Sequence, residues 1–469
     1  MVFSSITFLL FFLPVFLAVY YLLPLKFKNA WIVAASLLFY GWGAPVFIFS
    51  VVASCLIDHI AAAQFNKPLR KLSLWLGVGI NIALLIYFKY ADFFIENFNF
   101  IAHTLTGREI PLANIVLPVG ISFITFQKIS YLVDIYRGDS ERQNSFIDYL
   151  LFVLLFPQLI AGPIVRYKDI AIQINERFTQ ITTSNAFSGL VQFIFGLSKK
   201  VLIANVLGAY ADDVFNSQTD IMGYAASITG LLAYTLQIYF DFSGYSDMAI
   251  GLGRMMGFEL PVNFNFPYSS RSITEFWKRW HMTLGNWMKD YLYIPLGGNR
   301  GGQTYRNLMI VFLFSGLWHG ASWNFVLWGA FHGTFLVAER IGFENFLKRL
   351  PSVLRVLYTF TVVMAGWVLF RTENLSDAIS FYGSLVTPGG DHPNAWTTVN
   401  SKVIVAGMIG LIFSVVGSGI QAHLMRFYHP EKEPLIFSIG TGILALILFI
   451  YCVAELLATD FNPFIYFRF

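Results

Sequence analysis

The chain has 469 residues, of which 56% are hydrophobic and only 12% charged, with a formal net charge of +4 and a mean hydropathy of +0.62. Soluble domains carry about 25% charged residues, so this composition excludes an ordinary soluble protein and indicates an integral membrane protein. We expect the lipid bilayer as its environment and no nucleic-acid partner. The two cysteines, Cys55 and Cys452, lie in apolar stretches without CxxC spacing. We expect buried apolar side chains there, with no disulfide and no metal site.

Apolar runs recur from one end of the chain to the other and predict helices, because a helix satisfies its own backbone hydrogen bonds inside lipid. The first run has no basic n-region and no small-residue cleavage site, so we expect a retained transmembrane helix, not a signal peptide. No linker separates two soluble domains. We therefore predict an all-α polytopic membrane protein with a single membrane domain over residues 1–469. The runs cover 3–23, 30–43, 46–64, 72–90, 113–133, 146–165, 186–211, 222–252, 307–338, 354–372, 401–424 and 435–459.

The short loops between the first runs predict the orientation of the chain. Lys26 and Lys28 follow the first run, and three basic residues at 67–71 follow the third. The loop expected at 91–112 has Arg108 against three acidic residues. Since cytoplasmic loops are enriched in Lys and Arg, this pattern places the N-terminus outside. Beyond residue 145 the runs stop resembling simple spans and predict no orientation.

Two runs are irregular. FPQLIAGPIVRY, residues 156–167, contains two prolines and a glycine, and proline breaks helices. Such backbone survives at membrane depth only inside protein or beside a wet cavity, so we expect a re-entrant segment. In the run 186–211, Lys199 and Lys200 interrupt an apolar helix. Two interpretations stay open for these lysines: they reach the membrane interface along their apolar stems, or they form a cationic wall for an anionic ligand.

Positive charge collects in residues 262–306. Six basic minus two acidic residues give +4 there, which equals the net charge of the whole chain. Such a patch faces anionic lipid or holds a phosphate-bearing substrate, and charge alone favours the lipid role. The basic residues are Arg271, Lys278, Arg279, Lys289, Arg300 and Arg306.

An amphipathic helix is predicted inside this patch. Ser272 and Glu275 form a capping box, S-x-x-E, so the helix should begin at Ile273. Apolar residues, three tryptophans among them, then recur at helical spacing as far as Tyr291, which suits a helix lying in the membrane interface. The loop behind it, YIPLGGNRGG, is rich in glycine. Glycines let a backbone approach a ligand closely, but a plain turn is the default interpretation.

Three histidines lie in or beside these segments: His281, His319 and His332. An ionisable group within a membrane span is costly and marks a functional site by default, although a helical histidine is also found as an ordinary hydrogen-bonded side chain. Gly316 and Gly320 are expected to clear room beside the ring of His319. Local reasoning favours His319 as the catalytic residue, then His281, then His332. Without Cys or carboxylates at ligand spacing, we expect no metal site.

Polar residues also interrupt YFDFSGYSDMAIGLGRMMGF, residues 239–258. Two interpretations stay open for these residues. Asp241 and Ser243 could form a polar cluster at a catalytic centre, or the acids could pair with Arg254 or with backbone as structural contacts. The structural role is favoured for Asp247. Ser243 is not part of a G-x-S-x-G elbow, so a hydrolase-type nucleophile is not supported.

At these residues the chain resembles the membrane-bound O-acyltransferase family. Within that family it is similar to the membrane subunit of bacterial alginate O-acetylation and to relatives in peptidoglycan O-acetylation. The resemblance covers nearly the whole chain, and its two middle blocks are specific. It is carried by FPQLIAGPIVRY (156–167), YFDFSGYSDMAIGLGRMMGF (239–258), SITEFWKRWHMTLGNWMKDYLYIPLGGNR (272–300) and FLFSGLWHGASWNFVLWGAFHG (312–333), with the opening MVFSSITFLLFFLP and the closing NPFIYFRF.

The resemblance implies a ring of tilted transmembrane and re-entrant helices around a central catalytic site, with a catalytic core at about 113–340. It puts the family's near-invariant histidine on His319 and its second polar position on His281. It also implies an acyl thioester donor, acetyl-CoA for the alginate type. The acetyl group would cross the bacterial inner membrane to a periplasmic partner of the SGNH-esterase-like type. A polysaccharide acceptor would be reached through that partner, and the motifs do not identify it.

Acyl transfer from a thioester to a hydroxyl needs a base near neutral pH, which histidine supplies. We expect His319 to be the general base. His281 is expected to orient the donor or to polarise the thioester carbonyl. The CoA phosphates are expected at the cytoplasmic mouth, held by Arg271, Lys278, Arg279 and Arg300.

Three alternatives compete with an exporting O-acetyltransferase. The same fold could move another acyl group, such as D-alanine onto teichoic acid, although the block 272–300 is closer to the acetylation branch. A channel or transporter without covalent chemistry fits the many apolar runs, although no two halves with inverted similarity are visible. The last alternative is a scaffold that only docks the periplasmic partner. Turnover of a labelled donor separates the two enzymes from the two non-enzymes.

Overall fold

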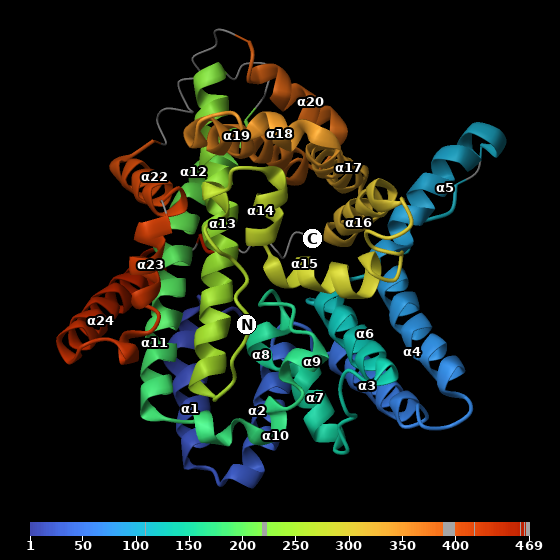
Figure 1. The fold of residues 1–469 in the computed structure, drawn as a ribbon, viewed down its shortest axis with the longest axis vertical. Coiled ribbons are helices and arrows are strands. Elements are labelled where there is room, and N and C mark those ends of the chain that lie inside the picture. Colours follow the sequence, from blue (N-terminus) through green and yellow to red (C-terminus); the bar gives the residue numbers. More distant parts are fainter. Residues whose placement is uncertain are drawn as a thin grey trace. The chain divides into compact units, whose positions relative to one another are not determined.

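The computed structural model describes all residues except 108, 218–222, 388–398, 417, 460, 464 and 466–469, so Arg108 and most of the closing FIYFRF lie outside the described residues. The described part is helical without any strand (Figure 1), which confirms the all-α expectation. The chain divides into two compact units, and the predicted core at 113–340 includes parts of both. The single membrane domain stays a prediction. Unit 1 comprises 1–2, 7–182 and 256–260, and unit 2 comprises 3–6, 183–255 and 261–469.

The helices of unit 1 begin and end where local sequence requires it. Pro24 precedes the second helix, Gly138 ends another at a φ of +82°, and the Ser145 hydroxyl accepts the Asp148 N–H at a third. The elements are η1 Phe8–Phe12, α1 Leu13–Leu22, α2 Leu25–Gly41, α3 Phe47–Ala62, α4 Arg70–Leu85, η2 Ile86–Tyr90, α5 Ala91–Thr106, α6 Ile121–Arg137, α7 Phe146–Leu154, α8 Phe156–Leu159, α9 Tyr167–Ile170, α10 Gln173–Glu176 and η3 Arg177–Gln180.

The prediction of a loop at 91–112 is wrong for most of these residues. Residues 91–106 form α5, which continues α4 and η2 without interruption. The acidic residue at its start has a structural role, because Asp92 accepts the backbone N–H groups of Ala113 and Ile115 as the chain returns. The orientation inferred from loop charges therefore loses one of its supports.

A buried ion pair joins α3 and α6 inside unit 1. Lys128 Nζ lies 3.2 Å from Asp58 Oδ2, and the two side chains are 2% and 0% exposed. Asn81 Nδ2 donates to Asp58 Oδ1 at 2.9 Å, and the Tyr149 hydroxyl donates to Asp58 Oδ2 at 3.2 Å. Because every partner comes from a different helix, this network fixes how α3, α4, α6 and α7 pack.

The irregular backbone predicted at FPQLIAGPIVRY is confirmed. Helix α8 ends after four residues, and 160–166 are non-helical, while 156–165 are all buried. Gly120, at a φ of +74°, permits the close approach of this segment. A Cβ there would stand 2.6 Å from the carbonyl oxygen of Leu159.

Unit 2 is built on long helices that pack closely through glycine. Helix α11 runs beside α13 (Figure 1). A Cβ on Gly196 of α11 would stand 2.5 Å from the carbonyl oxygen of Gly244 on α13. The elements are α11 Thr183–Ser198, η4 Lys199–Ala204, α12 Asn205–Phe215, α13 Tyr224–Met255, η6 Pro267–Ser269, α14 Ile273–Arg279, α15 Met282–Met288, η7 Lys289–Tyr293, α16 Thr304–His319, α17 Trp323–Ala338, η8 Glu339–Phe343, α18 Glu344–Leu347, α19 Ser352–Arg371, α20 Leu375–Ser384, α22 Ser401–Ser414, α23 Ser418–Arg426, η9 Pro430–Lys432 and α24 Leu435–Ala458.

The two lysines of η4 are paired with acids of α13. Lys199 Nζ lies 2.5 Å from Asp247, and Lys200 Nζ lies 2.8 Å from Asp241. Their charges are therefore compensated inside the unit, a pairing that neither interpretation offered for the lysines included. The structural pairing expected for the acids is confirmed for backbone, since Asp241 accepts the Ile465 N–H at 2.9 Å, whereas their ion-pair partners are lysines and not Arg254. Arg254 instead donates to the carbonyl oxygen of Tyr428.

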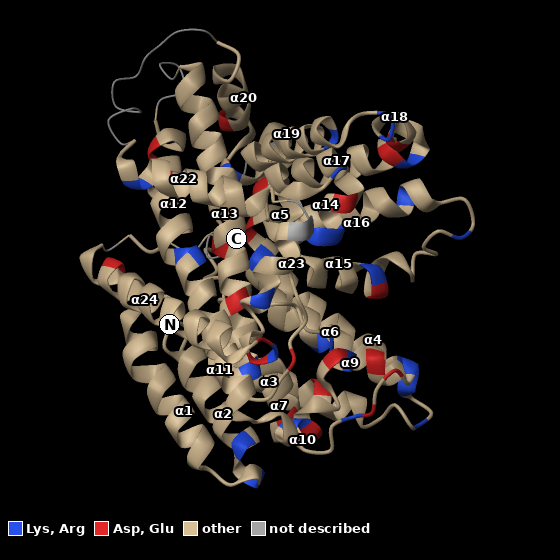
Figure 2. Cartoon of the chain, turned by 60° about the vertical axis from the view of Figure 1, so that its left-hand side comes forward, with Lys and Arg blue, Asp and Glu red and all other residues tan. Residues whose placement is uncertain are grey.

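Apolar surface is extensive, as expected for a membrane protein. Four helices among the described residues are long and apolar enough to span a bilayer: 70–105, 183–215, 352–371 and 435–458. On α24, Ile436 and Ile450 are 87% and 60% exposed. Figure 2 shows long helices almost free of charged residues. Water would penalise so much exposed aliphatic surface, whereas lipid does not.

Candidate active site

His319 is the last residue of a helix. The apolar run 307–338 divides into α16 and α17, which pack against each other, and the chain turns between them at 320–322. Gly320, directly after His319, has an extended backbone with φ −160° and ψ 149°. The sequence GLWHGASW thus places the histidine at a helix end, where its ring is 5% exposed.

The glycines near His319 serve the packing of these two helices. A Cβ on Gly316 would stand 2.1 Å from the carbonyl oxygen of Phe325, and one on Gly320 would stand 2.1 Å from the Phe325 ring. The expectation that they clear room beside the histidine is therefore wrong. They let the first turn of α17 lie directly against the end of α16, which sets the position of His319.

Aromatic rings surround His319 on several sides. The ring centroid of His319 lies 4.9 Å from that of Trp318, 5.2 Å from Trp328 and 5.2 Å from Phe370. We call these three residues the aromatic wall. Trp328 and Phe370 were not singled out from the sequence. Trp328 lies inside the block 312–333 that carries the family resemblance, whereas the signal for Phe370 was the high aromatic content of the apolar runs, which does not distinguish a site from ordinary packing.

The amphipathic helix predicted from Ile273 to Tyr291 is interrupted. Its capping box is confirmed, since the Ser272 hydroxyl accepts the Glu275 N–H at 3.0 Å. The helix then stops after Arg279, and α15 begins at Met282. The break is stabilised by a neighbouring segment, because Asn265 N–H donates to the Arg279 carbonyl and Met282 N–H donates to the Asn263 carbonyl, both at 2.9 Å.

His281 lies at this break, in a left-handed conformation with φ +45°. Few residues other than glycine adopt that conformation, and they do so mainly where the surroundings hold them. The side chain is 1% exposed, and its Nδ1 lies 3.0 Å from Asn263 Oδ1. Its Nε2 is buried and has no hydrogen-bond partner in the described part of the chain.

The protonation state of His281 follows from its burial. Helices α14 and α15 have seven residues each, about 10 Å of helix, so neither spans a bilayer of about 30 Å. Burial lowers the pKa of His281 to about 3. The ring is therefore neutral at physiological pH, with one nitrogen that carries a proton and one that accepts a hydrogen bond.

His281 and His319 share one aromatic neighbour. The Trp318 ring centroid lies 6.3 Å from that of His281 and 4.9 Å from that of His319. Both histidines belong to unit 2, so the two predicted catalytic residues lie close together within one compact unit. They are 38 residues apart in the sequence, and the fold brings both rings to the same tryptophan.

His332 lies in the same aromatic region, on α17. It is fully buried, and its ring contacts Trp277 at 5.0 Å and Trp328 at 5.1 Å. Gly366 of α19 leaves space for it, since a Cβ there would stand 2.6 Å from the His332 Nε2. The ring fills the space between α14, α17 and α19.

Glu339 is a site-supporting residue that sequence reasoning missed. Its buried carboxylate accepts the backbone N–H groups of Ile273 and Thr274 at 2.7 and 2.8 Å, and the Tyr358 hydroxyl at 3.2 Å. A carboxylate at the start of a helix stabilises the exposed N–H groups there. Glu339 therefore ties η8 to α14, the helix that leads to His281. Nothing in the sequence indicated this pairing across 66 residues.

The predicted CoA-binding residues come from two segments. Arg271, Lys278 and Arg279 lie on or just before α14, whereas Arg300 lies in the loop after η7. Arg279 pairs with Glu275 at 2.8 Å, and the same carboxylate accepts the Arg271 N–H at 2.9 Å. Arg271, Lys278 and Arg300 are exposed.

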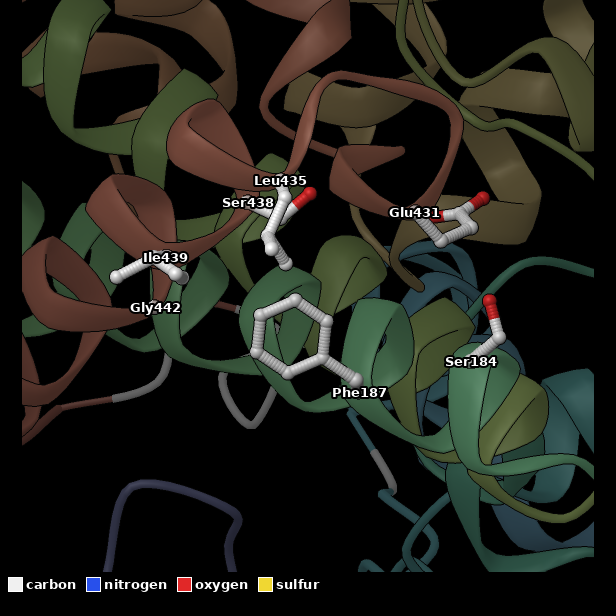
Figure 3. Close-up of a pocket in the computed structure, with 7 residues that line it drawn as sticks. All are labelled: Ser184, Phe187, Glu431, Leu435, Ser438, Ile439 and Gly442. Carbon is white, nitrogen blue, oxygen red and sulfur yellow. The ribbon is translucent and has the colours of Figure 1, made fainter.

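A shallow pocket of about 400 Å³ lies elsewhere in unit 2 (Figure 3). It contains none of the predicted site residues. Phe187 of α11 and apolar residues of α24 line most of it, with Glu431 beside them. The pocket therefore does not mark the candidate active site, which is built from α14 to α17 and the end of α19.

Comparisons with known proteins find relatives that match the whole chain. A sequence profile of the membrane-bound O-acyltransferase family matches residues 140–370. The chain is 42% identical to a protein of Pseudomonas putida and 40% identical to one of Azotobacter vinelandii, both named probable alginate O-acetylase AlgI, over 100% of each chain. It is 38% identical to the peptidoglycan O-acetyltransferase of Helicobacter pylori, over 83% of this chain and 80% of that protein.

Proposed function

The chain belongs to the membrane-bound O-acyltransferase family, and from that premise we propose that it transfers acetyl groups from acetyl-CoA for O-acetylation of an envelope or secreted polysaccharide. The full-length similarity to proteins named alginate O-acetylase supports this branch of the family. The observation that carries the proposal is that His319 and His281 both contact Trp318, with His319 packed against the aromatic wall. Such surroundings exclude water, which would otherwise hydrolyse the thioester.

In the proposed reaction His319 is the general base. One ring nitrogen takes the proton of the accepting hydroxyl as that oxygen attacks the thioester carbonyl carbon. The carbon–sulfur bond then breaks, an ester forms, and the proton passes to the departing CoA thiolate. Positioning by a histidine base contributes about 10²–10⁴ in rate. The aromatic wall fixes the ring, so that little reorganisation is needed at the moment of transfer.

The donor would enter beside α14. Arg271, Lys278 and Arg279 supply positive charge in the segment that leads to His281, and Arg300 supplies it in the loop after η7. Guanidinium groups suit phosphate oxygens. We place this donor side at the cytoplasmic face of a bacterial inner membrane. The acetyl group would leave at the opposite face through a periplasmic partner of the SGNH-esterase-like type, which passes it to the polymer.

The test uses the full chain in liposomes with acetyl-labelled CoA outside and a hydroxyl-bearing polysaccharide as the acceptor. We expect wild type to release free CoA, and His319→Gln to release it about 10²–10⁴ times more slowly, because glutamine keeps polarity but cannot serve as a base. His429→Gln, which changes a histidine outside the aromatic wall, is the control and should match wild type.

Wild-type rates in His319→Gln would overturn the assignment of the base. Release from a D-alanyl carrier protein but not from acetyl-CoA would overturn the donor. No release from any thioester, with or without an added periplasmic partner, would favour the transporter and scaffold alternatives.

A further inference from the structure

Among the described residues, Asn263 is the one whose side chain forms a hydrogen bond with a ring nitrogen of His281. This bond determines which of the two nitrogens carries the proton. The Asn263 side chain is 1% exposed. Its Oδ1 lies 3.0 Å from His281 Nδ1, 2.8 Å from the Thr283 hydroxyl and 3.4 Å from the Thr283 backbone nitrogen. Its Nδ2 donates to the Ser246 hydroxyl at 3.0 Å. All four groups belong to unit 2.

The orientation of this amide follows from its neighbours. The Thr283 backbone N–H can only donate, so the Asn263 atom facing it must be the oxygen. An amide oxygen can only accept, and therefore His281 Nδ1 must donate its proton to it. The neutral ring then carries its single proton on Nδ1, and Nε2 presents a lone pair.

We propose that Asn263 is a positioning residue that locks His281 in the Nδ1–H tautomer, so that Nε2 accepts a hydrogen bond from a donor group of the substrate. This inference rests on the proposed acetyl transfer. A thioester carbonyl oxygen needs a hydrogen-bond donor, so the expectation that His281 polarises that carbonyl does not fit this ring. An N–H or O–H group does fit. The pantetheine amides of the donor and the hydroxyl of the acceptor both offer one.

The backbone supports the same role. The Asn263 carbonyl accepts the Met282 N–H at 2.9 Å, so this residue also contacts the backbone directly after His281. The left-handed conformation of His281 is held by this backbone bond together with the side-chain bond to Nδ1. These two bonds fix the His281 ring, so that its Nε2 faces one direction. A hydrogen bond to the substrate requires such a fixed direction.

The first experiment reads the tautomer directly. Full-length protein with ¹⁵N-labelled histidine rings is reconstituted in lipid nanodiscs, and the His281 signals are assigned by difference from His281→Gln. We expect a protonated Nδ1 and an unprotonated Nε2 from pH 5 to pH 8 in wild type. In Asn263→Leu, which has a similar shape but no acceptor, we expect the proton to move to Nε2. A wild-type ring protonated on Nε2, or an unchanged tautomer in Asn263→Leu, would overturn the proposal.

The second experiment measures turnover of variants that are present in the membrane at wild-type levels. Asn263→Leu should lower kcat/KM about 10–100-fold. Asn263→Asp keeps an acceptor for Nδ1–H and should recover part of that loss, and Ser246→Ala, which removes the other partner of the amide, should stay within about threefold of wild type. Equal losses in Asn263→Leu and Asn263→Asp would indicate a merely structural role.

The same variants separate the two substrate groups. If Nε2 binds a pantetheine amide, Asn263→Leu raises the KM for acetyl-CoA even in the slow residual hydrolysis measured without an acceptor. If it binds the accepting hydroxyl, hydrolysis of acetyl-CoA is unchanged and transfer alone falls. The tautomer measurement needs no turnover, so a failure of acetyl transfer as the function is distinguishable from a failure of this inference.

Discussion

His281 combines a strained backbone, complete burial and a neutral ring. The strained backbone and the buried ring N–H each cost free energy on folding, and a specific neighbour offsets each cost. The left-handed conformation is offset by the backbone bond between Met282 and Asn263, and the buried Nδ1–H by the side chain of Asn263. Such local strain is typical of positions that a reaction requires. His319, by contrast, has ordinary helical surroundings, and its position depends on how closely two helices approach.

The neutral ring of His281 predicts a pH dependence of stability. Its pKa is about 3 in the folded protein and about 6.5 in an unfolded chain. The unfolded chain therefore binds the additional proton between these values, so stability should be full above pH 6.5 and fall as the pH drops, by up to about 1.4 kcal/mol per pH unit. Melting temperatures in detergent at pH 7 and pH 5 test this. The fall should be smaller in His281→Gln, and identical slopes in both proteins would contradict it.

At the scale of elements, two helix pairs depend on glycine: α11 with α13, and α16 with α17. In the second pair a Cβ on Gly329 would stand 2.2 Å from the carbonyl oxygen of Phe312, so both faces of the contact lack room for a methyl group. Small residues let helices in a membrane approach closely and gain dispersion contacts. The end of α16, and His319 with it, is placed by this contact.

Gly316→Ala should therefore separate the two helices and displace His319. The added Cβ would meet the backbone of Phe325, which cannot move away as a flexible side chain could. We expect a loss of about 1–3 kcal/mol in stability and a fall in kcat larger than the rise in KM. Thermal unfolding and CoA release measure the two effects. Gly440→Ala on α24, where nothing lies within 4 Å, is the matched control and should have neither effect. Wild-type stability in Gly316→Ala would show that the helices are not in tight contact.

At the scale of the whole molecule, few charges stabilise a large apolar protein, and several of them are buried in pairs. Asp58 with Lys128 lies in unit 1, and Asp241 with Lys200 lies in unit 2. A buried pair is stable only while both partners and their hydrogen bonds are present. These pairs therefore specify how helices assemble within each unit, where apolar contacts alone would allow several arrangements.

Lys128→Met should destabilise unit 1, because it leaves the Asp58 carboxylate buried without a counter-charge. We expect a loss of about 3–5 kcal/mol, seen as less folded protein in membranes and a lower melting temperature. The double variant Asp58→Asn with Lys128→Met should recover much of the loss, since no uncompensated charge remains. Lys348→Met, which removes an exposed i,i+4 pair with Glu344, is the control and should cost less than about 1 kcal/mol. A single variant as stable as wild type would show that Asp58 is not held as an ion.

The sequence by itself was enough for the class of the protein and for its local signals. Hydrophobic composition, the broken helix at FPQLIAGPIVRY and the capping box at Ser272 are properties of neighbouring residues, so local patterns predict them. The motifs around His281 and His319 also led to the correct family. None of these inferences needs to know which segments meet in space.

Only the tertiary structure decided how those segments combine. The apolar periodicity predicts helices that continue through Trp280 and through Gly320, because apolar residues keep their helical spacing across both positions. The helices nevertheless stop there, since Asn263 pairs with the first break and Phe325 packs into the second. The lysines of η4 pair with acids that are more than 40 residues away in the sequence, and Glu339 accepts the Ile273 N–H across 66 residues. Long-range pairing depends on the fold as a whole, and for that reason the surroundings of both histidines could not be derived from the sequence.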